Sequence, residues 1–327
     1  MNANPFKSYI RFVLGIGGLT TLAMFAYAML NGHLSANFWI FRCNASGYSD
    51  EYYLGFCSDP AFGSYEHGAF YFGLDETNIA NLQLSKVLFL GNSRAKKAFS
   101  AKTFVDFFSQ RGVKYFNFAF AGETDVFPKI IIEKHDVRPK VVVASADYFF
   151  YGTANVFARE ILSNTPQTKL EYSLKNWIQP FHEKICSAGG HPLKNLICGN
   201  RETQYRSRIN GRVFSPNWPE DKKLSLEYTG EYPSQIVPQL LKNARSFKEF
   251  LAERNACLVI TVVPSPLASP EVGREIARVL DVPFVLPIAK NIFSYDGSHM
   301  DTDSAEIWSA AFLESFQPVM EKCLGGS

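Results

Sequence analysis

From residue 86 onward, short apolar runs alternate along the chain with longer amphipathic stretches. The apolar runs are "KVLFLG" from Lys86, "KYFNFAF" from Lys114, "KVVVASA" from Lys140, "CLVITVVP" from Cys257 and "VPFVLPI" from Val282. Continuous apolar runs of this length are typical of strands buried on both faces of a sheet. The amphipathic stretches predict helices at about 101–110, 125–134, 234–254, 270–280 and 303–320. This alternation favours an α/β fold in which a doubly wound parallel sheet lies between two helical layers.

Two regions interrupt this rhythm. Residues 31–85 are rich in aromatic residues, glycine and serine without a sustained period, so we expect a connecting segment packed on the domain. Residues 151–232 contain Trp177, Trp218 and the turn-like "INGRVFSPNW". We interpret them as a cap inserted into an α/β domain that spans 86–327. Its aromatic residues would stack on sugar rings or form the core of the cap itself.

The N-terminal part of the sequence predicts a membrane anchor. Residues 12–30 are nineteen positions without a charge, and Lys7 and Arg11 precede them. At about 1.5 Å per residue, such a helix nearly matches a hydrocarbon core of about 30 Å. The preceding positive charges favour a cytoplasmic N-terminus at residues 1–11 and a periplasmic domain after a single inner-membrane span. A cleaved signal peptide is the alternative, because Ala26-Tyr27-Ala28 fits a cleavage site; either reading exports the domain.

The cysteines agree with export. The sequence has six, an even number, and none forms a C-x-x-C pair of the kind that binds zinc. The spacing alone leaves fifteen pairings open. Pairing Cys43 with Cys57 and Cys186 with Cys198 would close short loops and leave Cys257 with Cys323.

Composition excludes some classes of protein and partner. The chain has 327 residues, of which 46% are hydrophobic and 20% charged, enough for one large core. The 33 basic and 31 acidic residues are too balanced to attract nucleic acid by bulk charge. His135 and His182 have no partners at ligand spacing, so we predict neither a metal site nor a cofactor.

A small polar corner follows the first apolar run. In "FLGNSR", Gly91 and Asn92 precede Ser93, which would lie at the carboxyl end of a buried strand. Ligands of open α/β sheets bind at that edge, where a serine hydroxyl is exposed and backbone N–H groups are free. Ser93 is therefore either a nucleophile or simply the cap of the next helix. The pattern of a phosphate-binding P-loop is absent from the sequence.

A second polar cluster precedes the last predicted helix. In "YDGSHMDTDSAEIW", Asp296 stands three residues before His299, and Asp303 is a candidate cap for the helix. A serine nucleophile needs an imidazole to accept its proton and a carboxylate to hold the imidazole. The alternative is a turn at Asp296 with His299 on the surface. The loop follows the last apolar run, so it should reach the same sheet edge as Ser93.

In these two blocks the sequence resembles the SGNH (GDSL-type) hydrolase superfamily. "FLGNSR" is similar to its first block and "DGSH" to its last, over about residues 86–320. The resemblance implies Ser93 as nucleophile, His299 as base and Asp296 as the residue that orients the base. It also implies an oxyanion hole formed by the backbone N–H groups of Ser93 and of Gly122 in "FNFAFAGETD".

One block departs from the family pattern. The family's third block supplies an asparagine to the oxyanion hole, whereas "VVVASADYFF" has Ser145 and Asp147 in that region. A carboxylate would repel an oxyanion, so we expect Asp147 to be structural or to face Arg94 or a substrate hydroxyl. Asn92, Arg94 and Asp147 are the candidate substrate contacts. The basic run of Arg94, Lys96 and Lys97 would bind an anionic sugar or form the solvated face of a helix.

The resemblance implies a function as well as a fold. Membrane-tethered members of the superfamily act beside a polytopic acyltransferase, which suggests transfer of O-acyl groups, expected to be O-acetyl, to a cell-envelope polysaccharide. Two alternatives stay open. One is a plain esterase that removes such groups, and the other is a non-catalytic glycan-binding or scaffold subunit with a degenerate site.

Overall fold

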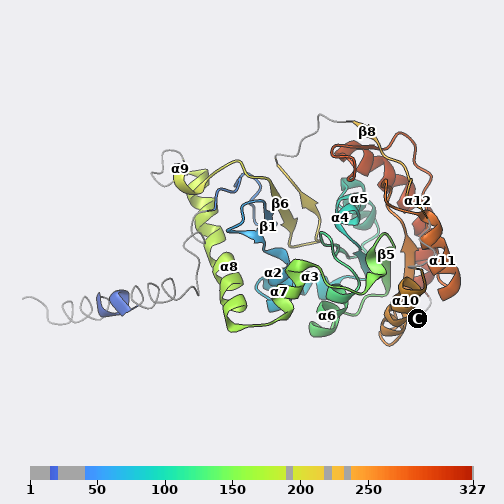
Figure 1. Ribbon diagram of the computed structural model, residues 1–327, viewed down its shortest axis with the longest axis horizontal. Coiled ribbons are helices and arrows are strands. Elements are labelled where there is room, and N and C mark those ends of the chain that lie inside the picture. Colours follow the sequence, from blue (N-terminus) through green and yellow to red (C-terminus); the bar gives the residue numbers. More distant parts are fainter. Residues whose placement is uncertain (1–14, 21–40, 189–193, 217–222, 232–236, 326–327) are drawn as a thin grey trace, which may run out of the picture.

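The computed structural model describes residues 15–20, 41–188, 194–216, 223–231 and 237–325 (Figure 1). Its centre is a four-stranded parallel sheet made of β3 (Val87–Leu90), β4 (Tyr115–Asn117), β5 (Val141–Ser145) and β9 (Cys257–Thr261). The strand order is β4-β3-β5-β9. The chain therefore moves outward from β3 first on one side and then on the other, which is the doubly wound arrangement, and ligands bind at its reversal point between β3 and β5.

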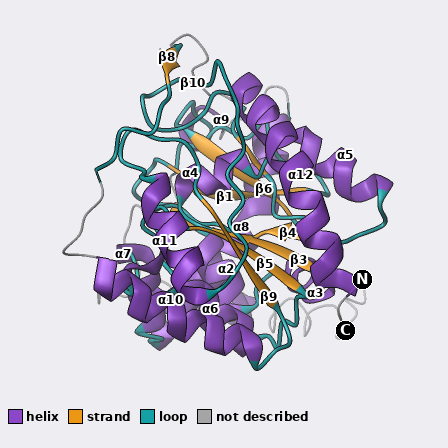
Figure 2. Ribbon diagram, turned by 90° about the vertical axis from the view of Figure 1, so that its right-hand side faces the viewer, coloured by secondary structure: helices purple, strands orange, loops and turns teal. Residues whose placement is uncertain are grey.

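Helices cover both faces of this sheet (Figure 2). On one face lie α4 (Ser93–Ala98), α5 (Lys102–Gln110) and α12 (Thr302–Gly325), and on the other lie α3 (Glu76–Leu84), α6 (Val126–Lys134), α10 (Val237–Ala252) and α11 (Pro270–Leu280). Strand side chains alternate between the faces: Phe89 packs with α4 and α12, whereas Leu88 packs with α6 and α10. The predicted three-layer α/β architecture is confirmed.

The predicted fifth strand is wrong. In the run from Val282, Phe284 makes only an isolated parallel bridge to Ile260. The Val285 N–H donates to the Ile260 carbonyl at 2.9 Å. Pro283 and Pro287 have no N–H to donate, so a longer ladder cannot form along β9.

A second, antiparallel sheet has the order β2-β1-β6-β7. It joins β1 (Tyr52–Cys57) and β2 (Gly63–Ser64) from the predicted connecting segment to β6 (Thr203–Ser207) and β7 (Val213–Phe214) from the predicted insertion. Figure 1 shows these blue and yellow segments side by side. Residues 41–84 are thus not an irregular connection, and the insertion is not a cap on its own, because the two regions form one sheet.

Helices complete this second part. They are α2 (Glu66–Phe72), α7 (Val156–Leu162), α8 (Pro166–Ser187) and α9 (Lys194–Ile197). The short η2 (Phe149–Tyr151) packs instead in the α/β core, where Phe149 and Phe150 are buried. Trp177 of α8 is 56% exposed, so it belongs to no core, and Trp218 lies outside the described residues. Tyr53, Tyr65 and Tyr172 are buried with Cys43 and Cys57 in a core separate from the two cores of the α/β sheet.

Each of the three disulfides lies within one of these two parts. They join Cys43 to Cys57, Cys186 to Cys198, and Cys257 to Cys323. The first two close local loops, and the third ties β9 to the end of α12. Of the predicted anchor at 12–30, only residues 15–20 are described, as helix. Among the described residues, no helix has both the length and the apolarity that a bilayer crossing needs.

Candidate active site

Ser93 lies where the chain turns from β3 into α4. Gly91 has a φ of +151°, and a Cβ at this position would lie 2.5 Å from the Cβ of Ala95. The turn therefore requires glycine. The Asn92 side chain accepts a hydrogen bond from the Arg94 N–H at 3.0 Å, so Asn92 caps the helix. Ser93 is the first helical residue, which rules out the reading of Ser93 as the cap and leaves its hydroxyl available.

The loop with His299 is held from both sides. Before it, β10 (Phe293–Ser294) pairs with β8 (Leu224–Ser225) from the inserted region. After it, α12 begins at Thr302, and Asp301 accepts the Ser304 N–H at 2.7 Å. Asp301 is the cap, and the expectation for Asp303 is wrong because Asp303 already lies inside the helix.

Ser93, His299 and Asp296 form one hydrogen-bonded chain. His299 Nε2 lies 2.8 Å from Ser93 Oγ, and His299 Nδ1 lies 2.7 Å from Asp296 Oδ2. The other carboxylate oxygen, Asp296 Oδ1, accepts the backbone N–H groups of Ser298 and His299 at 2.9 and 2.8 Å. The structure thus brings together three residues that the two motifs placed about two hundred positions apart. Their order is that of a nucleophile, a base and an orienting carboxylate.

The charges of this group suit base catalysis. Partial burial raises the pKa of Asp296, but hydrogen bonds from His299 and Ser298 outweigh it and lower the pKa to about 2. Burial and the nearby Lys97 lower the pKa of His299 below its ordinary value, against the opposing effect of Asp296. At neutral pH the carboxylate is therefore ionised and the imidazole is neutral, as a general base must be.

Gly122 faces the same cavity as Ser93. This cavity has a volume of about 360 Å³. Its lining residues are Asn92, Ser93, Arg94, Gly122, Glu123, Thr124, Tyr148, Tyr151, Thr153, Ala154 and Asn155. Gly122 adopts a φ of +63° in the loop after β4, a conformation that favours glycine. The two residues expected to form the oxyanion hole therefore border one cavity beside the hydroxyl.

Asp147 faces Arg94 instead of the cavity. Its carboxylate lies 2.5 Å from Arg94 Nη1 and accepts from Asn92 Nδ2 at 3.1 Å. Its side chain is only 2% exposed, and it is not among the cavity residues. Arg94 Nε also donates to Ser298 Oγ at 3.0 Å, which links the end of β5 to the His299 loop. Asp147 is thus a buried support, and the expectation that it contacts substrate is wrong; Asn92 and Arg94 do border the cavity.

The rest of the basic run is buried. Lys96 is 2% exposed and its Nζ lies 2.6 Å from Glu66 Oε1. Lys97 is 8% exposed, and its Nζ lies 4.1 Å from the centre of the Tyr295 ring. Burial lowers the pKa of Lys97 to about 6 despite the nearby Asp296. These two lysines therefore do not form the solvated face of a helix.

The sequence motifs missed several cavity residues. Tyr148, Tyr151 and Asn155 come from the segment that follows β5, at the start of the insertion. Tyr148 has a φ of +59° and is 40% exposed. The aromatic run "DYFFYG" directly after a strand was the available signal, since loops at that edge carry the site residues of open sheets.

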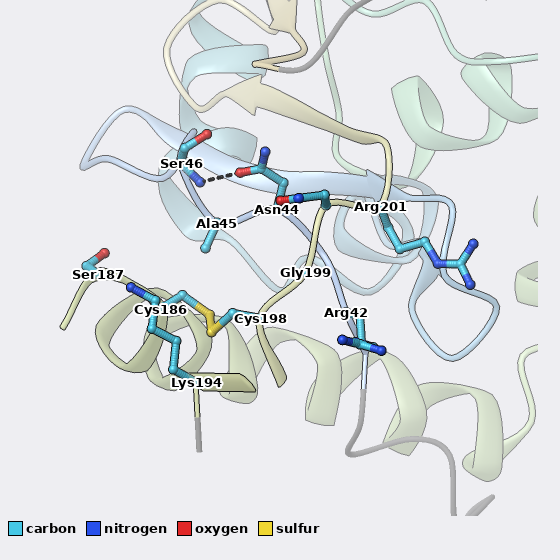
Figure 3. Close-up of a pocket in the computed structure, with 11 residues that line it drawn as sticks. Arg42, Asn44, Ala45, Ser46, Cys186, Ser187, Lys194, Cys198, Gly199 and Arg201 are labelled. Atoms are coloured by element: carbon cyan, nitrogen blue, oxygen red, sulfur yellow. Dashed lines mark hydrogen bonds between the residues drawn. A yellow bond between two sulfur atoms is a disulfide. The ribbon is translucent and has the colours of Figure 1, made fainter. Parts of the chain in front are cut away.

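A larger cavity lies elsewhere, beside the disulfide between Cys186 and Cys198 (Figure 3). Its volume is about 810 Å³, and Arg42, Lys194 and Arg201 are among its lining residues. It contains no member of the serine–histidine–aspartate group, so it is not the candidate active site. Within the described ranges, histidine, cysteine and carboxylate side chains form no group of three suited to a metal ion.

Comparison with known proteins gives a loose structural likeness only. The sequence matches no protein-family model and no curated protein. A solved structure described as an acylhydrolase from Bacteroides fragilis shares 13% identity over 74% of this chain and 94% of its own, with a TM-score of 0.35. A GDSL-like lipase from Bacteroides thetaiotaomicron shares 14% identity over 78% and 98%, with a TM-score of 0.38. Similarity this low carries no argument about activity, which rests on the site.

The motifs and the geometry agree with each other. The nucleophile turn follows the first strand of the parallel sheet, and the aspartate and histidine precede its last helix. The residues of the two motif blocks, Ser93, His299 and Asp296, thus contact one another beside the parallel sheet.

Proposed function

We propose that the protein is a serine enzyme that cleaves and transfers O-acyl groups. The observation that carries the proposal is the continuous contact from Ser93 Oγ through His299 to Asp296, at 2.8 and 2.7 Å. This contact ends in a cavity wide enough for an ester group. A hydroxyl, a neutral imidazole and an ionised carboxylate in this order are the requirements for acyl-serine chemistry.

The reaction begins when Ser93 Oγ attacks the ester carbonyl carbon and His299 Nε2 accepts the hydroxyl proton. The N–H groups of Ser93 and Gly122 stabilise the oxyanion, and Asp296 stabilises the imidazolium. The tetrahedral intermediate then expels the alcohol, which takes the proton from His299, and leaves an acyl-serine. An incoming hydroxyl, activated by His299, attacks the acyl-serine and restores Ser93.

Two donors, rather than three, serve the oxyanion in this proposal. Asn155 borders the cavity, but its Nδ2 donates to the Ala121 carbonyl at 2.7 Å. Asn92 Nδ2 is likewise engaged by Asp147. Neither side chain replaces the asparagine missing from the third block. Loss of one such donor costs on the order of 100-fold in rate, which predicts a slower enzyme and not an inactive one.

We propose a carbohydrate polymer of the cell envelope as the substrate, with acetyl as the acyl group. Tyr148 and Tyr151 border the cavity, and the centroids of their rings lie 5.2 Å apart. We propose that this pair of neighbouring rings stacks on a sugar ring. Three disulfides support an exported protein. Membrane attachment through residues 12–30 and a polytopic acyltransferase as acyl donor remain part of the proposal.

Transfer and hydrolysis share every step up to the acyl-serine. They differ in whether a sugar hydroxyl or water attacks the acyl-serine. Tyr148 and Tyr151 border the cavity in which this attack would occur. Mass spectrometry of the products from an acetyl ester, with and without a glycan acceptor, separates the two. An acetylated glycan supports transfer, whereas acetate in both reactions identifies an esterase.

A fluorophosphonate probe tests the nucleophile directly. We expect covalent labelling of the folded protein at Ser93 and no labelling of Ser93→Ala. Ser298→Ala is a matched control, because Ser298 precedes His299 in the same loop and its hydroxyl accepts a hydrogen bond from Arg94 Nε. This variant should be labelled like the original protein. A folded protein that is not labelled would reject the enzyme in favour of a glycan-binding subunit.

A further inference from the structure

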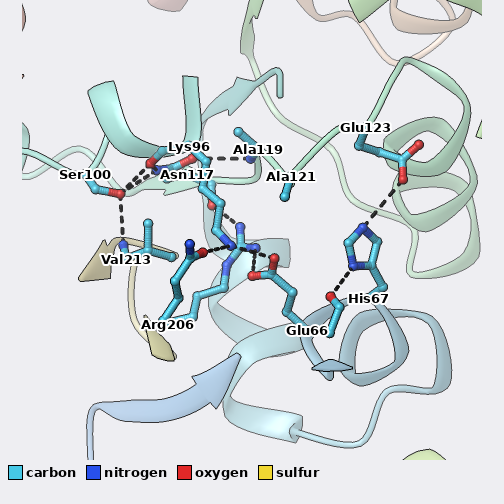
Figure 4. Close-up of polar contacts among 12 residues, drawn as sticks. Glu66, His67, Lys96, Ser100, Asn117, Ala119, Ala121, Glu123, Arg206 and Val213 are labelled. Carbon is cyan, nitrogen blue, oxygen red and sulfur yellow. Dashed lines mark hydrogen bonds and ion pairs between the residues drawn. The ribbon is translucent and has the colours of Figure 1, made fainter. Parts of the chain in front are cut away.

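The first two residues of α2, Glu66 and His67, contact the two segments that carry Ser93 and Gly122 (Figure 4). Glu66 and His67 are buried, at 1% and 0% exposure. Glu66 contacts the helix that carries Ser93, and His67 contacts the loop that carries Gly122. A buried carboxylate or imidazole costs free energy unless its polar atoms have partners, so both contacts constrain where α2 lies.

The Glu66 contact fixes the nucleophile helix. Glu66 Oε1 lies 2.6 Å from Lys96 Nζ, and Glu66 Oε2 lies 2.9 Å from Arg206 Nη1 on β6. Burial raises the pKa of Glu66, but Lys96 and Arg206 outweigh it and lower the pKa, so the carboxylate is ionised. Lys96 is three residues after Ser93, and α4 is therefore tied to α2 and to the antiparallel sheet.

The His67 contact reaches the other loop. His67 Nε2 lies 3.5 Å from Glu123 Oε2, and His67 Nδ1 lies 2.8 Å from Ser64 Oγ. The ring packs against Phe120 and Phe127, with centroids 4.9 and 5.1 Å away. The side chains of His67 and Glu123 are fully buried. Glu123 borders the cavity without exposing its carboxylate, so the effect of both side chains passes through the loop.

Glu123 follows Gly122 directly and fastens its loop. Glu123 Oε1 accepts the backbone N–H groups of Thr124 and Asn155, at 3.1 and 3.3 Å. The Asn155 side chain donates to the Ala121 carbonyl at 2.7 Å. The residues on both sides of Gly122 are thus joined to one buried carboxylate, and this carboxylate contacts His67.

We propose that His67 and Glu123 are positioning residues that aim the Gly122 N–H at the oxyanion, with Glu66 and Lys96 holding the Ser93 helix at a matched distance. The inference rests on the proposed function and adds two residues to which the resemblance assigns no role. A displacement of about 1 Å in such a donor is enough to cost on the order of 100-fold in rate. The effect should fall on the chemical step and leave substrate binding unchanged.

Substitutions at Glu123 give the decisive comparison. Glu123→Ala removes the acceptor for both backbone N–H groups, and we expect kcat for para-nitrophenyl acetate to fall about 10- to 100-fold with KM unchanged. Glu123→Gln keeps an oxygen that accepts these N–H groups, so it should restore kcat to within about fivefold of the original protein. His67→Phe keeps the ring packing but removes the polar contact, and kcat should again fall with KM unchanged.

Tyr53→Phe is the matched control, because it removes a buried hydrogen bond, from Asn78 Nδ2 at 3.1 Å, in which neither His67 nor Glu123 takes part. It should leave kcat unchanged. If the original protein reacts with the probe but Glu123→Ala and His67→Phe both keep kcat within about twofold, the positioning role is wrong while the proposed function stands. If the original protein neither reacts with the probe nor cleaves the ester, both fail. Should Glu123→Ala not fold, the kcat of folded His67→Phe and Glu123→Gln decides.

Discussion

Replacement of Asp296 by asparagine tests the proposed catalytic group most sharply. Asp296 Oδ1 accepts two backbone N–H groups, from Ser298 and His299, while Oδ2 accepts from His299 Nδ1. In Asp296→Asn, the amide oxygen can take only one of these places. With the oxygen toward the backbone, the amide nitrogen donates to His299 Nδ1 and forces the ring proton onto Nε2, where it blocks the transfer from Ser93.

The magnitude follows from the two orientations of the amide. Turning the amide over would leave two backbone N–H groups facing another donor, at about 1–3 kcal/mol each when buried. Because the Asp296 side chain is 37% exposed, we take about 1 kcal/mol for each, which favours the blocking orientation by about 30-fold. We therefore expect kcat to fall by at least about 30-fold, which corresponds to about 2 kcal/mol in the activation free energy, because the minor orientation restores the tautomer but not the negative charge beside the imidazolium.

Initial rates of para-nitrophenyl acetate hydrolysis measure this change, with circular dichroism to show that the variant is folded. Asp301→Asn is the matched control: the same chemical change occurs five residues along, where asparagine still caps α12. It should alter kcat by less than about twofold. A folded Asp296→Asn protein that retains more than about a tenth of the original kcat would refute the assignment of Asp296 as the residue that sets the His299 tautomer.

Three further predictions concern pH and stability. The imidazole must be neutral, so kcat/KM should fall as pH drops through the pKa of His299. Burial and Lys97 lower that pKa, so Lys97→Met should move this acidic limb to higher pH; an unmoved or lowered limb would contradict the charge effect. Phe89 is fully buried among Phe99, Phe104 and Phe312, so Phe89→Ala should lower the free energy of unfolding in urea by about 3–5 kcal/mol, and a loss below about 1 kcal/mol would contradict the packing. The disulfide of Cys257 and Cys323 spans 66 positions, and replacing both by alanine should cost about 4 kcal/mol by the loop-entropy estimate; equal stability in chemical denaturation would reject it.

Much of the α/β sheet follows from local pattern. The runs that contain Leu88, Val142 and Val259 are apolar at consecutive positions. Such a run is typical of a strand that is covered on both faces. Four of the five predicted strands form. Part of the catalytic group was predictable for the same reason. Ser93 follows a strand that forms, so its place at the carboxyl edge of the sheet could be predicted. The run before His299 makes only an isolated bridge, so the contact between His299 and Ser93 was predictable from the motif pair rather than from a strand.

The second sheet was not predictable, because its contacts are between distant segments. Nothing in the sequence of β1 indicates that its partner is β6, since each strand is short and separated from the other by the whole first half of the α/β domain. The burial of Lys96 depends on that pairing, because Lys96 contacts Glu66 and Glu66 contacts Arg206. Glu66 lies in the predicted connecting segment and Arg206 in the predicted insertion, so the local pattern did not indicate their contact. The contact of Asp147 with Arg94, by contrast, was among the expectations, because a carboxylate would repel an oxyanion.

The antiparallel sheet imposes an order on how the molecule matures. β1 can pair with β6 only after Ser207, the partner of Tyr52, has been synthesised. The nucleophile turn after β3 is synthesised much earlier. Contacts between such distant segments form slowly. A nascent chain therefore carries Ser93 for an interval before Arg206 is present to anchor Glu66 and before His299 is present to activate the hydroxyl, so chemical competence is one of the last properties that the folding chain acquires.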